Sequence, residues 1–595
     1  MYTYANQTDD DRDRIFAADQ ENIFVIDDDD EHDCGNSACA AAYPQPQNAE
    51  DDVISTNDHQ NPWSFFPSSV VAILLTETAE KFSYYGFRAI LVLYLTKQLS
   101  FTESTAISLF AYMTSFATLM PLFGAVISDG YLGKYMTVLI FSSIYAVGIG
   151  ILTGAAYASD VTFTFIGLFL ICVGTGGIKP CVSPFGADQL HNVSRNDGAN
   201  KQLVQKYFSY YYLGVNVGAL ASFLLMPSIR ARFGFGAAFC SSASFMIFAL
   251  VVFVSKKSEY VIIKPGDTNH LSMDADGMPR QGTKLTNVMR IYIRMAKTEL
   301  ISRIRCNRRG IYSRTNVNAG ETDRVGDEDR DTTTQNGFHG VSQQEVTDAK
   351  EVLRVLPVLA AFPAFWMLYD QLGSVWTLQA NNMNLHGVQP EQLGVLNPLL
   401  ILVFIPLFDQ HIYPWCQRRG WSIEPLRRMA CGMLLIAISF FMSGVLEAAV
   451  EKGDIQANEV EAAGNNGDGD SYRIDIWWQV PQIIVISTAE ILVSVTGLEF
   501  VYANSPHSMK SVIMAMYSLT FCIGDLFGGL FYSCLANVSR DLLLHICGLL
   551  MLVNLVVFKR FVESWWNKGA SIAEQDKVKG RNIKEGTEIE LPPLS

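Results

Sequence analysis

Twelve long apolar blocks, separated by shorter polar stretches, constrain this chain more than any other feature of its sequence. The hydrocarbon core of a bilayer is about 30 Å thick, so a helix needs about 20 apolar residues to cross it. Because backbone groups in lipid must satisfy their own hydrogen bonds, helices are the favoured spanning segments. Apolar residues make up 49% of the chain and charged residues 17%. The sequence therefore predicts an all-α polytopic membrane protein, with spans at 67–97, 105–128, 135–158, 161–184, 207–228, 235–256, 354–380, 393–415, 426–448, 476–500, 510–535 and 540–562.

The polar segments divide these spans into two sets of six. The first 62 residues include DDDD and lack the basic region and cleavable apolar segment of a signal peptide, so we expect a disordered acidic tail. The linker between the sixth and seventh spans carries KLTNVMRIYIRMAKTELISRIRCNRRG, a basic stretch suited to an amphipathic helix on the membrane surface. The expected divisions are a tail at 1–62, a six-helix bundle at 63–257, the linker at 258–350, a second bundle at 351–566 and a tail at 567–595.

The distribution of Lys and Arg predicts the orientation. Basic residues gather in the linker, in QRRGWSIEPLRR after the eighth span and in SRNDGANKQLVQK after the fourth. These segments share one side if both termini are cytosolic, which is the side that basic loops prefer. The acidic stretch 447–470 is then an outward loop. The plasma membrane is the default location, and an endosomal or lysosomal membrane is the alternative.

The first predicted span contains ETAEKFSYYGFR, which places four charges inside an otherwise apolar stretch. At about 100° per residue these polar side chains fall on one stripe of a helix, with Tyr85 at its edge. The stripe consists of Glu77, Glu80, Lys81, Tyr84 and Arg88. A charge at the bilayer centre costs at least about 2.5 to 3.5 kcal/mol, so we expect the stripe to line an interior cavity. The alternative is a structural network of ion pairs between neighbours four residues apart.

Other spans carry single polar residues of the same kind. The cation Lys179 lies in the fourth span, whereas the carboxylates Asp370 and Glu490 lie in the seventh and tenth. Asn216 and Asn397 lie in the fifth and eighth spans, where each could also serve only as a hydrogen-bonding contact between helices. Cations in the first six spans thus face carboxylates in the last six, a distribution that packing alone explains poorly.

Several classes of protein are disfavoured. No G-x-x-x-x-G-K-[ST] occurs, so ATP is not the expected energy source. The nine histidines lie almost entirely outside the spans and suggest no catalytic triad, so we do not expect an enzyme. The eleven cysteines indicate neither a disulfide framework nor a zinc site. We expect no cofactor, no metal and no nucleic-acid partner.

A series of motifs resembles the proton-coupled oligopeptide transporters of the major facilitator superfamily. ETAEKFSYYGFRAI is similar to that family's E-x-x-E-R-F-x-Y-Y-G signature. GTGGIKPCVSPFGADQ and YFSYYYLGVNVGAL follow in the family's order, and FWMLYDQLGSVWTLQANNM is similar to animal-type members. The match covers essentially all twelve spans. The resemblance implies a fold of two six-helix bundles and proton-coupled transport of short peptides.

The resemblance also implies roles for individual residues. Proton coupling falls to Glu77, Glu80 and Lys81, with Asp370 as a further protonation site that pairs with Lys179. The peptide carboxylate would bind Arg88 and Lys179. The peptide ammonium group would be held by Glu490, Asn216 and Asn397, and the pocket walls are matched by Tyr84, Tyr85 and Trp366. Arg354 and Asp409 align with an inner gate pair, although a solvated surface pair of small energy is the alternative.

These expectations combine into one mechanism. Every di- or tripeptide has a cation at one end and an anion at the other, so walls of opposite charge would bind it whatever its side chains. We expect a proton-coupled symporter, working as a monomer in the lipid bilayer, with small peptides and protons as its partners. The alternatives are a transporter of the same fold for histidine, nitrate or another metabolite, and a non-transporting peptide sensor.

Three departures from the family pattern affect this reading. The signature's arginine is Lys81 here, which keeps the charge but loses the two-pronged guanidinium. Animal members carry a functional histidine on the second helix, where this chain has Ala111. The large outward domain of mammalian members is replaced by about thirty residues, mostly acidic, Gly or Asn.

Overall fold

The computed structural model describes residues 66–190, 197–263, 352–421, 424–462, 472–505 and 510–566. These residues are almost entirely helical, and the β-type contact among them is one isolated bridge between Asn384 and Asp475. The predicted acidic tail, most of the linker with its basic segment, and the C-terminal tail lie outside the described residues.

Ten helical segments of the described residues are long and apolar enough to cross a membrane. One of them, Leu203–Ser255, is two helices that meet at Gly234, where a positive φ of 85° interrupts the helix. The helix α1 (Ser68–Leu93) carries the charged stripe and lies outside these ten. With the long segment counted as two helices and α1 included, the described residues hold twelve spanning helices, which confirms the prediction of an all-α polytopic membrane protein.

The first six helices precede the linker in the chain. α1 continues as a π-helical turn, η2 (Tyr94–Gln98). Side chains of Thr102 and Asp160 cap the starts of the second and fourth helices by accepting hydrogen bonds from backbone N–H groups. The other helices are α2 (Glu103–Ile127), α3 (Lys134–Ala158), α4 (Val161–Asp188) and α5 (Asp197–Ser255), which holds both the fifth and the sixth span.

The last six spans follow the linker, and four of them, the seventh, eighth, tenth and twelfth, consist of several helical pieces. The seventh contains α9 (Phe362–Tyr369), the 3-10 turn η7 (Asp370–Gly373) and α10 (Val375–Asn381). The eighth contains the 3-10 turn η8 (Pro390–Val395), α11 (Leu396–Leu407), the π-helical turn η9 (Phe408–Ile412) and α12 (Tyr413–Arg418). The remaining spans contain α13 (Pro425–Ala462), α14 (Val480–Glu490) with α15 (Thr496–Ala503), α16 (Lys510–Cys534) and α17 (Arg540–Val557).

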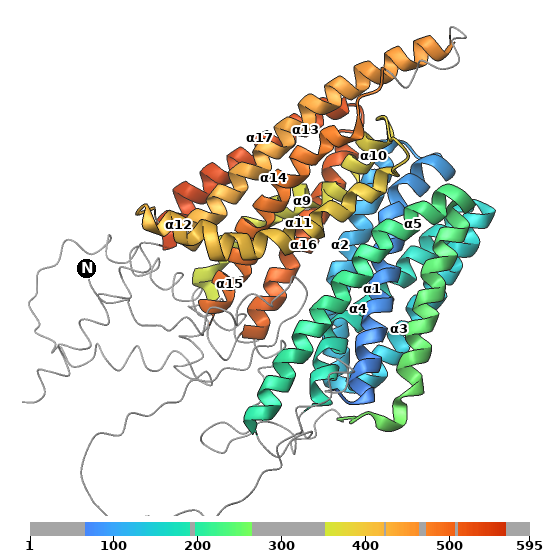
Figure 1. The fold of residues 1–595 in the computed structure, drawn as a ribbon, viewed down its shortest axis with the longest axis vertical. Helices are drawn as coiled ribbons and strands as arrows, with labels where there is room; N and C mark the ends of the chain where they lie inside the picture. Colours follow the sequence, from blue (N-terminus) through green and yellow to red (C-terminus); the bar gives the residue numbers. More distant parts are fainter. Residues whose placement is uncertain are drawn as a thin grey trace, which may run out of the picture.

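The two sets of helices lie side by side, the first set in blue to green and the second in yellow to red (Figure 1). Across the boundary α2 packs against α16, whereas α1 packs against α5 within the first set. We call the end of the bundle where α1 begins at Ser68 the near end, and the end where η2 follows α1 the far end. The charged residues of α1 lie between these ends.

Two helices are longer than the sequence predicts. The ninth span is expected to end at 448, but α13 continues to Ala462 through the stretch expected to be an outward loop. α5 begins at Asp197, ten residues before the predicted start of the fifth span at 207. Both extensions are rich in Ala, Gln, Glu or Lys, which are strong helix formers. Hydropathy detects only the part of a helix that lies in lipid, so it misses such extensions.

Candidate functional site

Three charged side chains of α1 form a compact cluster within the first set of helices. Lys81 Nζ lies 3.3 Å from Glu77 Oε1 and 3.4 Å from Glu80 Oε2, and all three side chains are buried. The Tyr211 hydroxyl of α5 donates a hydrogen bond of 2.6 Å to Glu77 Oε1. Two carboxylates therefore share one cation here, and a proton on either carboxylate would balance the charge of the cluster.

Arg88 and Asp370 join the two sets of helices by an ion pair. The Arg88 guanidinium also lies over the ring of Phe110 of α2, 5.1 Å from its centroid. Asp370 is placed here because α9 ends at Tyr369 and a 3-10 turn follows. From the sequence we expect Lys179 as the partner of Asp370, whereas the structure pairs Asp370 with Arg88; contact with Lys179 stays a prediction.

Lys179 reaches α1 through the close packing of α4. Its Nζ lies 4.7 Å from the ring centroid of Tyr84, and both side chains are buried. A Cβ atom added at Gly176 would lie only 2.4 Å from Met120 Cβ of α2, so the glycine permits an approach that no larger residue allows. The Lys179 ammonium group thereby contacts the charged stripe of α1 by a cation–π interaction.

Glu490 is held in place by a donor from another helix, Asn397 of α11. Asn397 Nδ2 of α11 donates hydrogen bonds to Glu490 Oε2, at 3.1 Å, and to the Tyr369 hydroxyl, at 2.8 Å. Ser487 Oγ fixes the orientation of Asn397 by donating to its Oδ1 at 2.6 Å. Directly after Glu490 the helix widens into the π-helical turn η12 (Ile491–Val495), a feature that often occurs at functional sites.

Three other predicted site residues lie in the helix walls. Tyr85 is half-buried, and Asn216 Nδ2 donates to the carbonyl oxygen of Tyr212 in its own helix at 2.9 Å. Trp366 is 1% exposed and stacks on Phe521 with ring centroids 3.4 Å apart. Contacts of these three side chains with a substrate stay predictions.

The predicted gate residues are not paired with one another in the described part of the chain. The Arg354 guanidinium lies over the ring of Trp566, 4.3 Å from its centroid. Asp409 is half-buried, and the charged groups near it are Arg428 and Glu499. Their role as a gate stays a prediction.

The far end carries a buried ion pair that the sequence does not indicate. Arg230 Nε of α5 lies 2.7 Å from Glu391 Oε1 of η8, and Arg230 Nη2 donates to Glu391 Oε2 at 3.1 Å. Arg230 Nη2 also donates to Gln389 Oε1 at 2.9 Å. The Glu391 side chain is only 1% exposed. The residues lie at the polar ends of their helices, where charged groups are ordinarily solvated, so the sequence pattern alone offers no signal.

A second arginine at the far end also bridges the two sets. Arg540 of α17 lies 2.9 Å from Glu103 of α2 and 2.6 Å from the buried Glu447 of α13. Gln379 Nε2 of α10 donates a further hydrogen bond of 2.9 Å to Glu447. Together with the pair of Arg230 and Glu391, this contact holds the far ends of the two sets against each other.

Asp525 of α16 is a buried carboxylate that the sequence analysis did not single out, although a lone acidic residue in an apolar span is the same signal that marks Glu490. Arg88, Lys179 and Asp370 are the charged groups that act on it. The centre of the bundle thus gathers two cations and two carboxylates from four helical elements.

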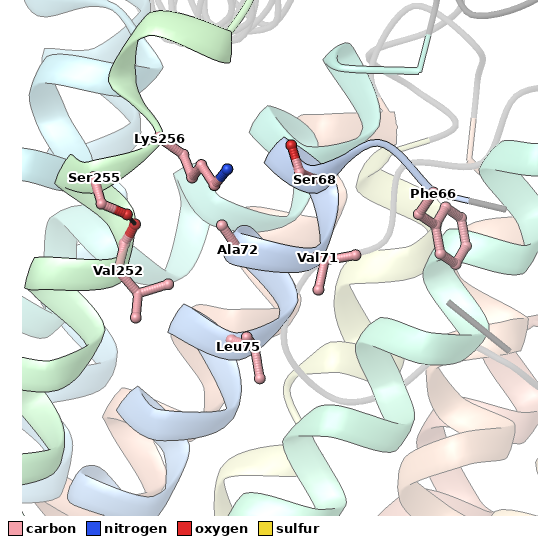
Figure 2. Close-up of a pocket in the computed structure, with 8 residues that line it drawn as sticks. All are labelled: Phe66, Ser68, Val71, Ala72, Leu75, Val252, Ser255 and Lys256. Atoms are coloured by element: carbon pink, nitrogen blue, oxygen red, sulfur yellow. Dashed lines mark hydrogen bonds between the residues drawn. The ribbon is translucent and has the colours of Figure 1, made fainter. Parts of the chain in front are cut away.

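A hollow of about 380 Å³ lies at the near end, between the start of α1 and the end of α5 (Figure 2). Glu259 is bonded to two of the residues that line it. Lys256 Nζ donates to Glu259 at 2.7 Å and the Ser68 hydroxyl donates as well, and these hydrogen bonds lower the pKa of Glu259. The lining residues are Phe66, Ser68, Val71, Ala72, Leu75, Val252, Ser255 and Lys256. None of them is a predicted site residue, so this hollow is separate from the charged site.

Two sets of six spanning helices that meet around buried, paired charges define a polytopic membrane protein of the two-bundle type. A sequence model described as the POT family matches residues 135–549. The chain is 36% identical over 415 residues to Peptide transporter family 1 of Drosophila melanogaster, covering 67% of this chain and 50% of that protein. It is 33% identical over 407 residues to human Solute carrier family 15 member 2, covering 65% of this chain and 50% of that protein. The chain belongs to the POT family.

Solved structures agree with this assignment. The POT family transporter PepTSo is 26% identical and superposes with a TM-score of 0.64, covering 84% of this chain and 98% of that one. An auto-inhibited POT family peptide transporter is 27% identical with a TM-score of 0.62, covering 83% and 96%. The chain spans about half the length of the curated relatives it matches.

Proposed function

We propose that this protein is a proton-coupled symporter that imports di- and tripeptides by alternating access. The observation that carries the proposal is the separation of charge between the two sets of helices. Arg88 and Lys179 belong to the first set, whereas Glu490 belongs to the second. The relatives named as peptide transporters support the same substrate class.

The charged groups suit the two ends of a peptide. Arg88 and Lys179 would bind the terminal carboxylate, and Arg88 can form two parallel hydrogen bonds with it. Glu490 would bind the terminal ammonium group, because Asn397 and Ser487 hold its carboxylate in one orientation. Since only the termini carry charge in every peptide, such a site accepts many side chains.

Proton coupling follows from competition for the cations. Asp370 is paired with Arg88 in the structure. When the peptide carboxylate takes Arg88, Asp370 loses its compensating charge and binds a proton instead. One charge carried through 100 mV supplies about 2.3 kcal/mol, and one pH unit supplies about 1.4. The total of about 3.7 kcal/mol sustains accumulation of several hundredfold per proton without ATP.

Alternating access requires that the two ends open in turn. We assign the near end to the cytosol, with both chain termini, because α12 ends there at Arg418, within the basic segment after the eighth span. The far end is then the outer side, which Arg230 with Glu391 and Arg540 with Glu103 hold closed. Arg354 and Asp409 would pair at the inner side when the far end opens.

The remaining expectations belong to this proposal. The protein works as a monomer in the lipid bilayer of the plasma membrane, or of an endosome or lysosome. The chain is divided into two six-helix bundles, a cytosolic linker and two cytosolic tails. Protons are its coupling ion, and it needs no other cofactor.

Uptake of a labelled dipeptide into proteoliposomes under an imposed proton gradient tests the proposal. We expect accumulation by the native protein and its loss in Glu490→Gln and Lys179→Ala. Matched controls at the near-end hollow, Glu259→Gln and Lys256→Ala, should accumulate the dipeptide normally. Binding without accumulation by the native protein would instead indicate a sensor, and selective accumulation of histidine, nitrate or another metabolite would indicate a different solute.

A further inference from the structure

Asp525 points into the wedge between α2 and the seventh span. On one side of α16, Cys522 O accepts a hydrogen bond from Ser115 of α2 at 2.8 Å. On another side, a Cβ atom added at Gly524 would lie 2.6 Å from the carbonyl oxygen of Pro363 in the seventh span. Successive residues are about 100° apart around the axis of α16, so Asp525 lies about 60° from Cys522 and about 100° from Gly524. It therefore lies between the face that contacts α2 and the face that contacts the seventh span. Its side chain is therefore directed between the two neighbours.

The same wedge holds the guanidinium of Arg88. Arg88 lies over Phe110 of α2 and is paired with Asp370 of the seventh span, so it touches both walls that flank Asp525. Gly373, just after Asp370, lies close enough to Phe110 that an added Cβ atom would be 3.2 Å from its ring. Asp370 and Asp525 thus approach one cation from different helices.

The surroundings of Asp525 suit a carboxylate that exchanges a proton. It is 4% exposed, and among the residues that the structure describes it forms no hydrogen bond and no ion pair within 4 Å. An ionised carboxylate in such a place costs several kcal/mol unless a cation or donors compensate it, and a bound proton removes that cost. The titratable groups that act on it are Arg88 from α1, Lys179 from α4 and Asp370 from the seventh span, together with Cys522 of its own helix.

We infer that Asp525 is a second acceptor for the transported proton, sharing this role with Asp370 beside Arg88. Two cations and two carboxylates balance in the empty site, and the carboxylate of an arriving peptide adds one negative charge. A proton from water restores the balance by bonding to a carboxylate oxygen of Asp370 or Asp525, and it returns to water when the peptide leaves. The inference rests on the proposed function, because it assigns a residue to proton-coupled peptide transport.

The test compares Asp525→Asn with Asp525→Glu in proteoliposomes. Three quantities are measured for each: gradient-driven accumulation of a labelled dipeptide, exchange of that dipeptide across the membrane without a gradient, and protons taken up per dipeptide with a pH-sensitive dye. We expect Asp525→Asn to keep exchange while its accumulation falls at least about tenfold and its pH dependence flattens. Asp525→Glu should restore accumulation and a steep pH dependence, shifted in pH from that of the native protein. Asp454→Asn removes a carboxylate that is paired with Arg473 near the far end of α13, and it should behave as the native protein.

The outcomes separate this inference from the proposed function. If the native protein takes up no protons with the dipeptide, the proposed function fails. If the native protein is coupled and Asp525→Asn has the same proton ratio and pH dependence, the inference fails alone. A raised KM in both accumulation and exchange, with the pH dependence unchanged, would also overturn it, because that result marks a residue that only holds Arg88 in position. If Asp525→Asn does not fold, Asp525→Glu alone decides. The inference is supported if this variant takes up as many protons per dipeptide as the native protein and its accumulation has a shifted pH dependence. An unshifted pH dependence in Asp525→Glu overturns the inference.

Discussion

Arg230 of α5 and Glu391 of η8 form a buried ion pair across the boundary between the two sets of helices, with Arg230 Nε and Glu391 Oε1 2.7 Å apart. Further bonds surround the pair, since Gln392 Nε2 donates to Ser228 Oγ and to the carbonyl oxygen of Leu224, both at 3.0 Å. All of these contacts must break when the far ends separate. The pair therefore stabilises the far-end-closed state relative to the open one.

Glu391→Gln should shift the protein toward the far-end-open state. Removing one partner of a buried ion pair costs about 3 to 5 kcal/mol, and water relieves that cost for Arg230 once the far end opens. Spin labels at Phe233 and Tyr472, which are exposed on the first and second sets, report the separation of the far ends. We expect a larger population of long distances in the variant.

The exchanged double variant, Arg230→Glu with Glu391→Arg, is the control for this prediction. It restores the pair with its polarity reversed, so the short distances should return. Lys256→Gln, at the near end, should leave the distribution as it is in the native protein. An unchanged distance distribution in Glu391→Gln would show that the pair does not hold the far end closed.

Glu490→Gln should weaken binding selectively at the peptide's amino terminus. A hydrogen bond to a charged group contributes about 1.5 to 3 kcal/mol, so the Kd of a dipeptide should rise roughly tenfold to a hundredfold or more. An N-acetylated dipeptide has no ammonium group, and its Kd should hardly change. Calorimetric titration of both ligands measures the difference, and an equal loss for both would place Glu490 away from the amino terminus.

Lys81→Met should destabilise the protein, whereas Lys81→Arg should be tolerated. The ammonium group of Lys81 lies within 3.4 Å of both Glu77 and Glu80, and its removal leaves two buried carboxylates without a cation. Such a loss costs about 3 to 5 kcal/mol. Thermal unfolding in detergent should show a clearly lower Tm for Lys81→Met at neutral pH. Equal Tm values for the two variants would indicate that the charge of Lys81 is dispensable.

Gly176→Ala should disturb the packing of α4 against α2, because its Cβ atom would lie 2.4 Å from Met120 Cβ. Overpacking of this kind costs about 1 to 3 kcal/mol. Gly154→Ala in α3 is the matched control, since no atom lies within 4 Å of its added Cβ. Thermal unfolding should show a lower Tm for Gly176→Ala and an unchanged or slightly higher one for Gly154→Ala. Equal behaviour of both variants would contradict close packing at Gly176.

The number of spanning helices and the burial of the α1 charges could be predicted because hydrophobic length and helical period are local properties of the sequence. The period places Glu77 and Lys81 on one face, and the structure joins them at 3.3 Å. The helix extension to Ala462 could not be predicted from hydropathy, because lipid no longer selects apolar residues there.

The partners of the site residues were harder to predict. Arg88 and Asp370 are far apart in the chain. Their pairing depends on the break at η7, and residues 364–369, which directly precede it, contain no proline or glycine that would predict the break. Asn216 shows a second difficulty. Its side-chain amide donates to a carbonyl oxygen of its own helix, and the sequence alone cannot distinguish this arrangement from a contact with a substrate. Residue type identified the chemistry of the site, whereas the packing of distant helices decided which groups meet.

The length of α13 has a practical consequence for imaging. Its 38 residues extend for about 57 Å at 1.5 Å per residue, well beyond the roughly 30 Å of a hydrocarbon core, and its end stands clear of the neighbouring helices (Figure 1). A soluble helical domain fused so that it continues α13 would lie beyond the detergent belt, where it would help to align the particles in electron micrographs.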